Sequence, residues 1–229
     1  LVEKGEVSLD LIDRAVSRIL RVKFLAGLFE NPYADPRRAV EVVGCAAHRR
    51  LARRIAQEAI ILLKNDGGLL PLGRGLCRIA VIGPNADVAQ LGDYSCWKAD
   101  AVTPLEGIRR VVSKRTEVVH ARGCGIWEPS REGFKEAVAA ARASDVAVVC
   151  IGGASMMMGG PGQGTDQRVA TCGEGYDCTD LSPPGVQEDL VRAVWQTGTP
   201  TVVVLIHGRP YSIAWMAEHV PAIVEAWYP

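Results

Sequence analysis

The sequence lacks an excess of charge of either sign. Its 229 residues include 26 Lys or Arg and 26 Asp or Glu, so the formal net charge is zero. Proteins that bind nucleic acids or other polyanions normally carry a basic excess, and the balance argues against that class of partner. Apolar runs of about eighteen residues are also missing, so no segment is expected to span a membrane.

Cysteine pairs of the type that bind zinc are absent as well. The seven cysteines form no C-x-x-C pair, and their odd number leaves at least one thiol free or paired with another chain. Cys150, in the stretch VAVVC, is expected to be a buried apolar residue. Cys172 and Cys178 are close enough in sequence to bridge, although spacing alone cannot establish the geometry. The first residues show neither a signal-peptide pattern nor an initiator Met, which is consistent with an internal boundary.

The N-terminal part of the chain predicts two amphipathic helices. Apolar residues recur at spacings of three and four over residues 8–26, with Ser8 as the N-cap. A second helix is expected from about residue 44 to residue 59, and residues 60–65 either continue it or are extended. The two prolines within residues 29–40 indicate a linker.

From Arg78 onward the pattern changes to alternating strands and helices. Nearly continuous apolar runs, typical of parallel strands buried on both faces, predict strands at 78–83, 116–121, 145–153, 199–208 and 222–228. Helical patterns lie between them, at 103–112, 130–143, 182–196 and 211–219. The expected fold is an α/β class: a doubly wound, mostly parallel sheet sandwiched by helices in a flavodoxin-like three-layer arrangement.

One connection, residues 154–182, is much longer than the others and rich in Gly, Met and Thr. It leaves the carboxyl end of a strand, where ligands bind in sheets of this kind, and such long loops are usually functional or disordered. Within it, Glu174 stands between Gly173 and Gly175, which permit φ > 0 and close backbone approach. The loop is therefore either a solvated turn or a device that presents a carboxylate outside its own domain.

The residues around Glu174 do not by themselves establish catalysis. A glutamate works as a general acid only where burial or a neighbouring carboxylate raises its pKa, and glycoside chemistry needs a second carboxylate. Asp180 is expected to serve the approach to the helix at Ser182, and nothing favours Asp177 as the partner. From the residues alone, a solvated loop glutamate is the favoured interpretation.

Other motifs also favour plain structural interpretations. The glycines of residues 159–164 neither follow a strand nor open a helix, so a flexible loop is favoured over a phosphate site. Residues 81–85 predict a tight turn at a strand end. The four histidines are scattered, and His207, at the end of a strand, is expected to be structural. The SMMM stretch either lines an apolar pocket or packs against the domain.

Several stretches taken together resemble glycoside hydrolase family 3, the two-domain β-glucosidases and β-xylosidases. Residues 15–33 resemble the segment that closes the family's N-terminal (β/α)8 barrel, and residues 48–72 resemble the entry to its second domain. Residues 173–191 resemble the family pattern GEGxDRxxLxLPGxQxxLV. The similarity keeps the family's order and includes, in addition, residues 79–87, 91–95, 103–108, 202–215 and 222–229.

The resemblance implies a domain organisation. Residues 1–28 would be the terminal helix of a missing barrel domain, residues 29–75 an interdomain linker and helix, and residues 76–229 an α/β-sandwich domain truncated at its C-terminus. The two N-terminal helices would then have apolar faces suited to a barrel, and self-association of the isolated chain is expected.

The resemblance also implies an activity for the parent enzyme: retaining, exo-acting hydrolysis of non-reducing terminal β-linked glucose or xylose. A barrel aspartate would be the nucleophile, and Glu174 would be the general acid/base by its place in the motif. The partners would be a β-linked oligosaccharide or an aryl or alkyl glycoside, together with the barrel domain. No metal or cofactor is required. The fragment alone would be inactive, and a periplasmic or secreted parent is favoured over a cytoplasmic one.

Proximity to the motif suggests further site residues. Tyr176 and Asp177 are expected to line the cleft, and Met156, Met157 and Met158 to face an aglycone site. Cys178 stands where the family has Arg, which predicts the loss of an ion pair that orders the loop, and Pro183 stands where it has Leu. The competing interpretations are a non-catalytic carbohydrate-binding or scaffolding domain and a flavodoxin-like nucleotide-binding module; the latter lacks a phosphate loop.

Overall fold

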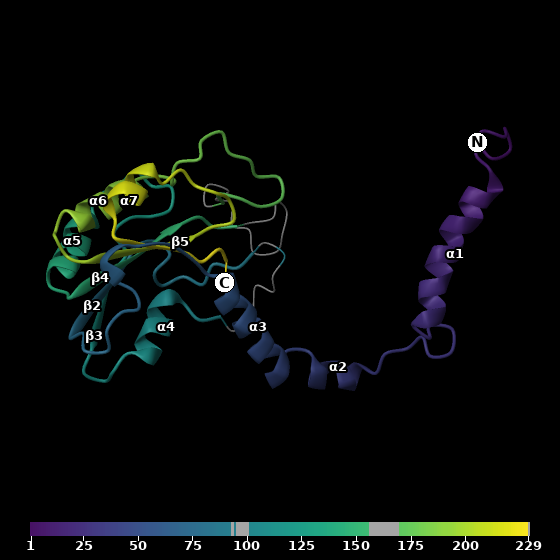
Figure 1. The fold of residues 1–229 in the computed structure, drawn as a ribbon, viewed down its shortest axis with the longest axis horizontal. Coiled ribbons are helices and arrows are strands. Elements are labelled where there is room, and N and C mark those ends of the chain that lie inside the picture. The colour runs from purple at the N-terminus through teal and green to yellow at the C-terminus, as the bar shows by residue number, and fades with distance from the viewer. Residues whose placement is uncertain (93, 95–100, 156–169, 229) are drawn as a thin grey trace. The chain divides into compact units, whose positions relative to one another are not determined.

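The computed structural model of the chain describes residues 1–92, 94, 101–155 and 170–228. Its elements are labelled in Figure 1. Contacts divide the chain into two compact units, Leu1–Arg54 and Ile55–Pro229, and each is described by itself. In the described ranges, no helix combines the length and the apolar character needed to cross a membrane.

The first unit is helical. Helix α1 (Leu9–Leu25) follows Ser8, and α3 (Ala46–Ala59) continues into the second unit, so both predicted helices are confirmed. Between them, α2 (Pro36–Val42) lies in a region predicted to be a linker. It forms because Asp35 caps it, accepting the Arg37 backbone N–H at 2.9 Å, and because Pro36 suits the first helical turn.

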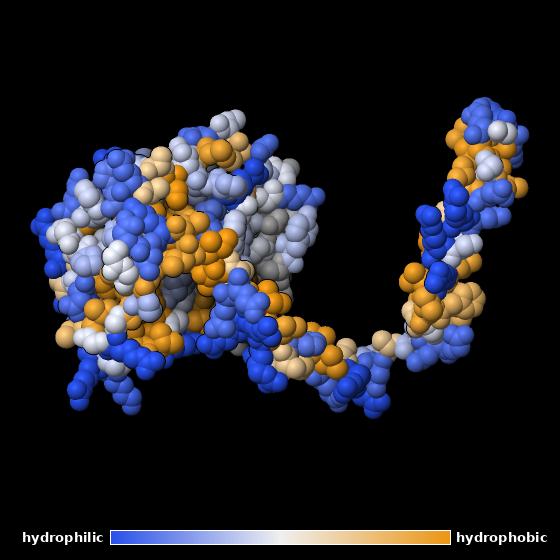
Figure 2. Space-filling model, in the orientation of Figure 1, coloured by the Kyte–Doolittle hydropathy of each residue, from blue (hydrophilic) through white to orange (hydrophobic). Residues whose placement is uncertain are grey.

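The apolar side chains of α1 are exposed. None of its residues is buried, and orange apolar spheres follow the helix in Figure 2. The exposed fraction of the residue is 62% for Leu9 and 61% for both Ile19 and Phe24. Such an amphipathic helix gains stability by packing its apolar stripe, so its need for a partner stays a prediction.

The second unit is built on a six-stranded sheet with the order β1-β6-β5-β4-β2-β3. The strands are β1 (Ile61–Asn65), β2 (Arg78–Ile82), β3 (Glu117–Ala121), β4 (Val146–Gly152), β5 (Thr201–Ile206) and β6 (Ala222–Glu225). All neighbours are parallel except β1 and β6, which pair antiparallel. All five predicted strands are therefore confirmed.

Strand β1 answers the question left open at residues 60–65, which are extended rather than helical. It is followed by a single 3₁₀ turn, η1 (Asp66–Gly68). Since β1 pairs with β6, the sheet includes residues from the 29–75 span that the resemblance assigned to the linker. The assignment of residues 1–28 to a barrel domain stays a prediction.

Helices cover both faces of the sheet (Figure 1). They are α4 (Pro104–Val111), α5 (Phe134–Arg142), α6 (Gln187–Trp195) and α7 (Ala214–His219). Residues of α5, α6 and α7 share one apolar core with one face of the sheet, and Leu105 of α4 shares a second core with the other face. The three-layer α/β/α fold predicted from the sequence is thus confirmed.

Three helices begin later than predicted, and the smallest shift is that of α7, which begins at Ala214 rather than at residue 211. Helix α5 begins at Phe134 rather than near Ser130, and α6 begins at Gln187 rather than near Ser182. Pro183, Pro184 and Gly185 precede Val186, the N-cap of α6, and both prolines are buried. Proline disfavours the helical conformation of the residue before it, so this approach is not helical and leads the chain from the long loop into α6.

Candidate functional site

The carboxyl ends of the parallel strands β2, β4 and β5 lie along one edge of the sheet. The buried side-chain amides of Gln187 and Asn85 hydrogen-bond to the backbone there and fix the end of β4. The Gln187 Nε2 donates to the Gly152 carbonyl at 2.8 Å, and the Gly152 N–H donates back to the Gln187 Oε1 at 2.8 Å. From the turn after β2, Asn85 Nδ2 donates to the Gly153 carbonyl at 3.2 Å. Because these amides are fully buried and paired, the end of β4 is a rigid platform for the connection that leaves it.

The long connection after β4 returns to this platform before it reaches Glu174. The Thr171 N–H donates to the Ala154 carbonyl at 2.8 Å, and Ser155 and Cys172 form a parallel β-bridge. Thr171 and Cys172 are buried. The chain therefore arrives at Gly173 along a fixed stem rather than as a free loop.

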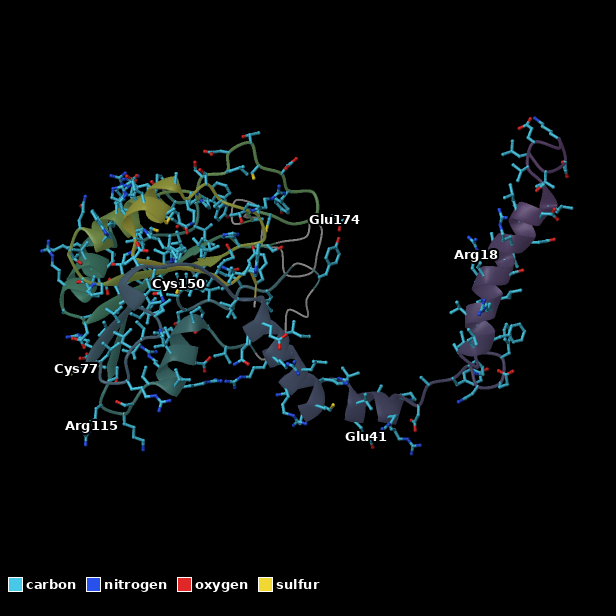
Figure 3. The ribbon with its side chains drawn as sticks, in the orientation of Figure 1. Arg18, Glu41, Cys77, Arg115, Cys150 and Glu174 are labelled. Carbon is cyan, nitrogen blue, oxygen red and sulfur yellow. The ribbon has the colours of Figure 1, made fainter. Side chains whose placement is uncertain are left out.

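Glu174 occupies the corner of a tight turn. The Tyr176 N–H donates to the Gly173 carbonyl at 3.2 Å, which closes a β-turn over residues 173–176. Gly175 has φ +80°, the value that a type II turn requires at its third residue and that favours glycine. The turn leaves Glu174 exposed, and Figure 3 shows it at the outer rim of the loop. Gly175 thus permits the turn that leaves the Glu174 side chain exposed.

Tyr94 contacts the Glu174 carboxylate directly. Its hydroxyl donates a hydrogen bond to Glu174 Oε2, from the connection between β2 and α4. Tyr94 is itself 75% exposed, so the pair lies at the surface. The bond orients one carboxylate oxygen. Sequence reasoning used the LGDYS stretch only as part of the resemblance and did not assign Tyr94 a role.

Arg209 contacts the far side of the turn. It follows β5, and its guanidinium donates from Nη1 to Asp177 Oδ1 at 3.1 Å and from Nη2 to the Tyr176 carbonyl. Close by, the Ser212 N–H donates to the Leu181 carbonyl at 2.7 Å. Two connections, one after β4 and one after β5, are therefore joined at this edge. No local sequence pattern marks Arg209 for this contact.

A buried polar cluster lies beneath these connections. The Cys172 Sγ is 3.0 Å from the Tyr228 hydroxyl, and the His207 Nε2 is 3.0 Å from Glu225 Oε2. Burial raises the pKa of the Tyr228 hydroxyl, so it stays protonated. His207 is 2% exposed, which agrees with its predicted structural role. Buried polar groups therefore lie under the edge of the sheet that carries the two connections.

The structure brings three of the predicted site residues together. Glu174 and Tyr176 share the turn and Asp177 directly follows it, whereas Met157, like Met156 and Met158, lies outside the described residues. The Tyr176 ring is half-buried and the Asp177 side chain is 97% exposed. Their predicted contacts with substrate stay predictions.

Two other sequence expectations concern residues of this loop. Asp180 accepts the Ser182 N–H at 2.8 Å, and this hydrogen bond holds the pKa of its carboxyl below the usual range. Asp180 therefore serves the approach to α6, as predicted. Cys172 and Cys178 are both free thiols, so the bridge that their spacing permitted is not formed.

Chemically, the edge offers a carboxylate on a rigid stem. Such a group can give or take a proton only if a reacting group is brought within hydrogen-bond reach. Among the residues that the structure describes, no cluster of three or more His, Cys, Asp or Glu side chains could hold a metal ion.

A comparison with known proteins identifies the family that this chain matches. The family model described as the glycosyl hydrolase family 3 C-terminal domain matches residues 60–229. A β-xylosidase from Formosa agariphila is 40% identical over 98% of this chain and 30% of its own length. Beta-D-xylosidase 1 from Arabidopsis thaliana is 35% identical over the whole chain and 28% of its own length.

Solved structures agree with the sequence relatives. A β-glucosidase from Erythrobacter marinus matches with a TM-score of 0.80 and 36% identity, over all of this chain and 33% of its own. A β-glucosidase from Listeria innocua in complex with glucose matches with a TM-score of 0.78 and 31% identity, over all of this chain and 29% of its own. The chain thus spans about a third of the length of these relatives.

Proposed function

Because this chain belongs to the glycosyl hydrolase family 3 C-terminal domain family, we propose that it is part of a retaining, exo-acting β-glycosidase. The substrate is a non-reducing terminal β-linked glucose or xylose, in an oligosaccharide or an aryl or alkyl glycoside. The relatives' names, β-xylosidase and β-glucosidase, support both sugars. In the complete enzyme the chain is joined to a (β/α)8 barrel domain that holds the sugar and supplies an aspartate nucleophile.

In the first step of the proposed reaction, the barrel carboxylate attacks the anomeric carbon while the glycosidic C–O bond breaks. Glu174 gives its proton to the departing oxygen, which leaves as an alcohol. The two carboxyl groups of a retaining pair lie about 5–5.5 Å apart. At this separation, the negative charge on the nucleophile favours the protonated form of its partner, and Glu174 therefore begins the cycle as an acid.

In the second step, water replaces the nucleophile. The ester bond to the barrel residue neutralises the nucleophile's charge, so Glu174 is now stable as a carboxylate and takes a proton from the attacking water. The water oxygen bonds to the anomeric carbon and the barrel carboxylate leaves. Two inversions restore the original β configuration, and Glu174 ends the cycle protonated.

The exposure of Glu174 carries this proposal. A carboxylate held at the corner of an anchored turn, facing away from its own sheet, is suited to a substrate bound by another domain. On this view the chain alone is inactive because it holds neither the nucleophile nor the sugar. One relative is named a periplasmic β-glucosidase, which supports a periplasmic or secreted parent.

The test is Glu174→Gln in the complete enzyme. General acid catalysis contributes about 10²- to 10⁴-fold, so kcat/KM for an alkyl glycoside should fall by that factor. The leaving group of an activated dinitrophenyl glycoside needs little protonation, so kcat/KM for this substrate should fall much less. Glu132→Gln, an exposed glutamate before α5, is the matched control and should behave as wild type.

Near-normal activity of Glu174→Gln on the alkyl glycoside would remove Glu174 from the mechanism. If the isolated chain nevertheless bound β-linked oligosaccharides in a titration, the non-catalytic carbohydrate-binding interpretation would replace this one.

A further inference from the structure

We infer that Arg209 is a positioning residue for the acid/base Glu174. Its guanidinium holds the turn at residues 173–176 against the connection that follows β5. The inference rests on the proposed function of Glu174. It assigns Arg209 no contact with substrate; Arg209 acts through the backbone of residues 173–177.

Arg209 starts from a fixed point. Strand β5 pairs with β4 and β6, and the Gly153 N–H donates to the Ile206 carbonyl at 2.8 Å just before the connection. The next residue, His207, is buried against Glu225. Arg209 lies only two residues after the buried His207, so its backbone has little freedom. Its side chain can therefore hold a neighbouring loop in place.

The connection that carries Arg209 runs directly against the stem of the Glu174 loop. A Cβ at Gly208 would lie 2.8 Å from the Tyr228 ring and 3.1 Å from Cys172 Sγ. Only glycine permits such an approach without displacing these neighbours. The arginine after this glycine is thereby brought beside the turn, although 33 residues of sequence separate Arg209 from Tyr176.

The guanidinium makes two contacts, which restrain the turn to different degrees. The Asp177 side chain is 97% exposed, so its ion pair with Arg209 is screened by water and contributes little. The Tyr176 carbonyl belongs to the last residue of the turn, and the Arg209 side chain that binds it is only 28% exposed. The carbonyl contact therefore restrains the turn, and the carboxylate contact mainly orients the guanidinium.

The planar guanidinium suits this task better than an ammonium would, since it presents separate N–H groups to a carbonyl and a carboxylate at once. Cys178 stands where the family pattern has Arg, and a thiol carries no positive charge. Arg209 provides the positive charge for this turn from a different strand connection. With Tyr94 bonded to the carboxylate and Arg209 to the backbone, Glu174 is oriented from two sides.

The experiment is a double-mutant cycle of Arg209→Gln and Glu174→Gln in the complete enzyme, with Arg209→Lys as a second variant. A displacement of about 1 Å can cost about 10²-fold, so Arg209→Gln should lower kcat/KM for an alkyl glycoside by about 10- to 100-fold. For a dinitrophenyl glycoside the loss should stay within about threefold. Arg209→Lys should fall between wild type and Arg209→Gln.

The cycle separates positioning from general damage. If Arg209 acts only through Glu174, adding Arg209→Gln to Glu174→Gln should cost no further activity on the alkyl glycoside. The control is Arg115→Gln, which changes an exposed arginine distant in sequence from Arg209 and should match wild type.

The outcomes also separate this inference from the proposed function. A normal Glu174→Gln enzyme would overturn the proposed function. A damaged Glu174→Gln enzyme with a normal Arg209→Gln enzyme would overturn only the inference. Equal losses on both glycosides, or additive losses in the double variant, would show that Arg209 merely stabilises the fold. Should Arg209→Gln fail to fold, the same criteria apply to Arg209→Lys.

Discussion

Strand β4 and the turn at residues 173–176 lie close in sequence but are held by different means. All seven residues of β4 are buried, and the strand pairs with β2 on one side and β5 on the other. The turn is partly exposed and is held by its own stem at Cys172 and by contacts from two other connections, through Tyr94 and Arg209. The sheet supplies stability and position, and in the proposed mechanism the turn supplies the reactive group. This division is common where function lies on loops carried by a rigid scaffold.

The largest expected difference between the two regions is in the free energy of unfolding. Ile151 in β4 is fully buried, and Ile151→Ala should lower that free energy by about 2–5 kcal/mol through lost burial and the cavity left behind. Glu174→Ala should stay within about 0.5 kcal/mol of wild type, because it removes an exposed side chain. Urea denaturation of the chain measures both. Equal losses would mean that the turn is part of the stabilising core.

A smaller effect is expected where the sheet and the loop meet. Gln187→Ala would leave the buried N–H and carbonyl of Gly152 without their side-chain partner, at a total cost of about 1–3 kcal/mol. The cost should appear in the unfolding free energy of the chain. Gln196→Ala, an exposed glutamine just after α6, is the control and should unfold as wild type does. A Gln187 variant as stable as the control would show that the amide does not fix the end of β4.

The smallest expected effect is a difference in thiol reactivity between Cys150 and Cys77, which is measured without any change in the stability of the chain. Burial raises the pKa of the Cys150 thiol to about 12, and the residue is fully buried in β4. Cys77, before β2, is exposed. At pH 8 iodoacetamide should therefore label Cys77 and spare Cys150 in the folded chain, because only an accessible thiolate reacts. Mass spectrometry of the peptides reads out both sites, and prompt labelling of Cys150 would mean that β4 opens readily.

Much of the sheet could be predicted from the sequence, because buried parallel strands leave continuous apolar runs such as residues 145–153. The strand at residues 61–65 could not be, since its short apolar run has no period that separates it from the preceding helix. Helix α2 was also missed, because its signal is a single cap at Asp35 beside two prolines rather than an apolar stripe.

The candidate site was predicted less completely. From residues alone, Glu174 was favoured as a solvated glutamate, and only the family resemblance gave it a catalytic role. Tyr94 and Arg209 lay beyond sequence reasoning because their contacts join residues 80 and 33 positions apart. Such contacts arise when the sheet brings the ends of separate strands to one edge, and no local pattern records them.

The most direct test of the central claim is the product formed by Glu174→Ala in the complete enzyme with a dinitrophenyl β-glycoside and sodium azide. Azide fills the space left by the carboxylate and attacks the glycosyl-enzyme without needing a base, so turnover should rise. Nuclear magnetic resonance should identify the product as the β-glycosyl azide, with the configuration retained by two inversions. Turnover that azide does not change, or an α-glycosyl azide, would contradict the assignment of Glu174 as the acid/base.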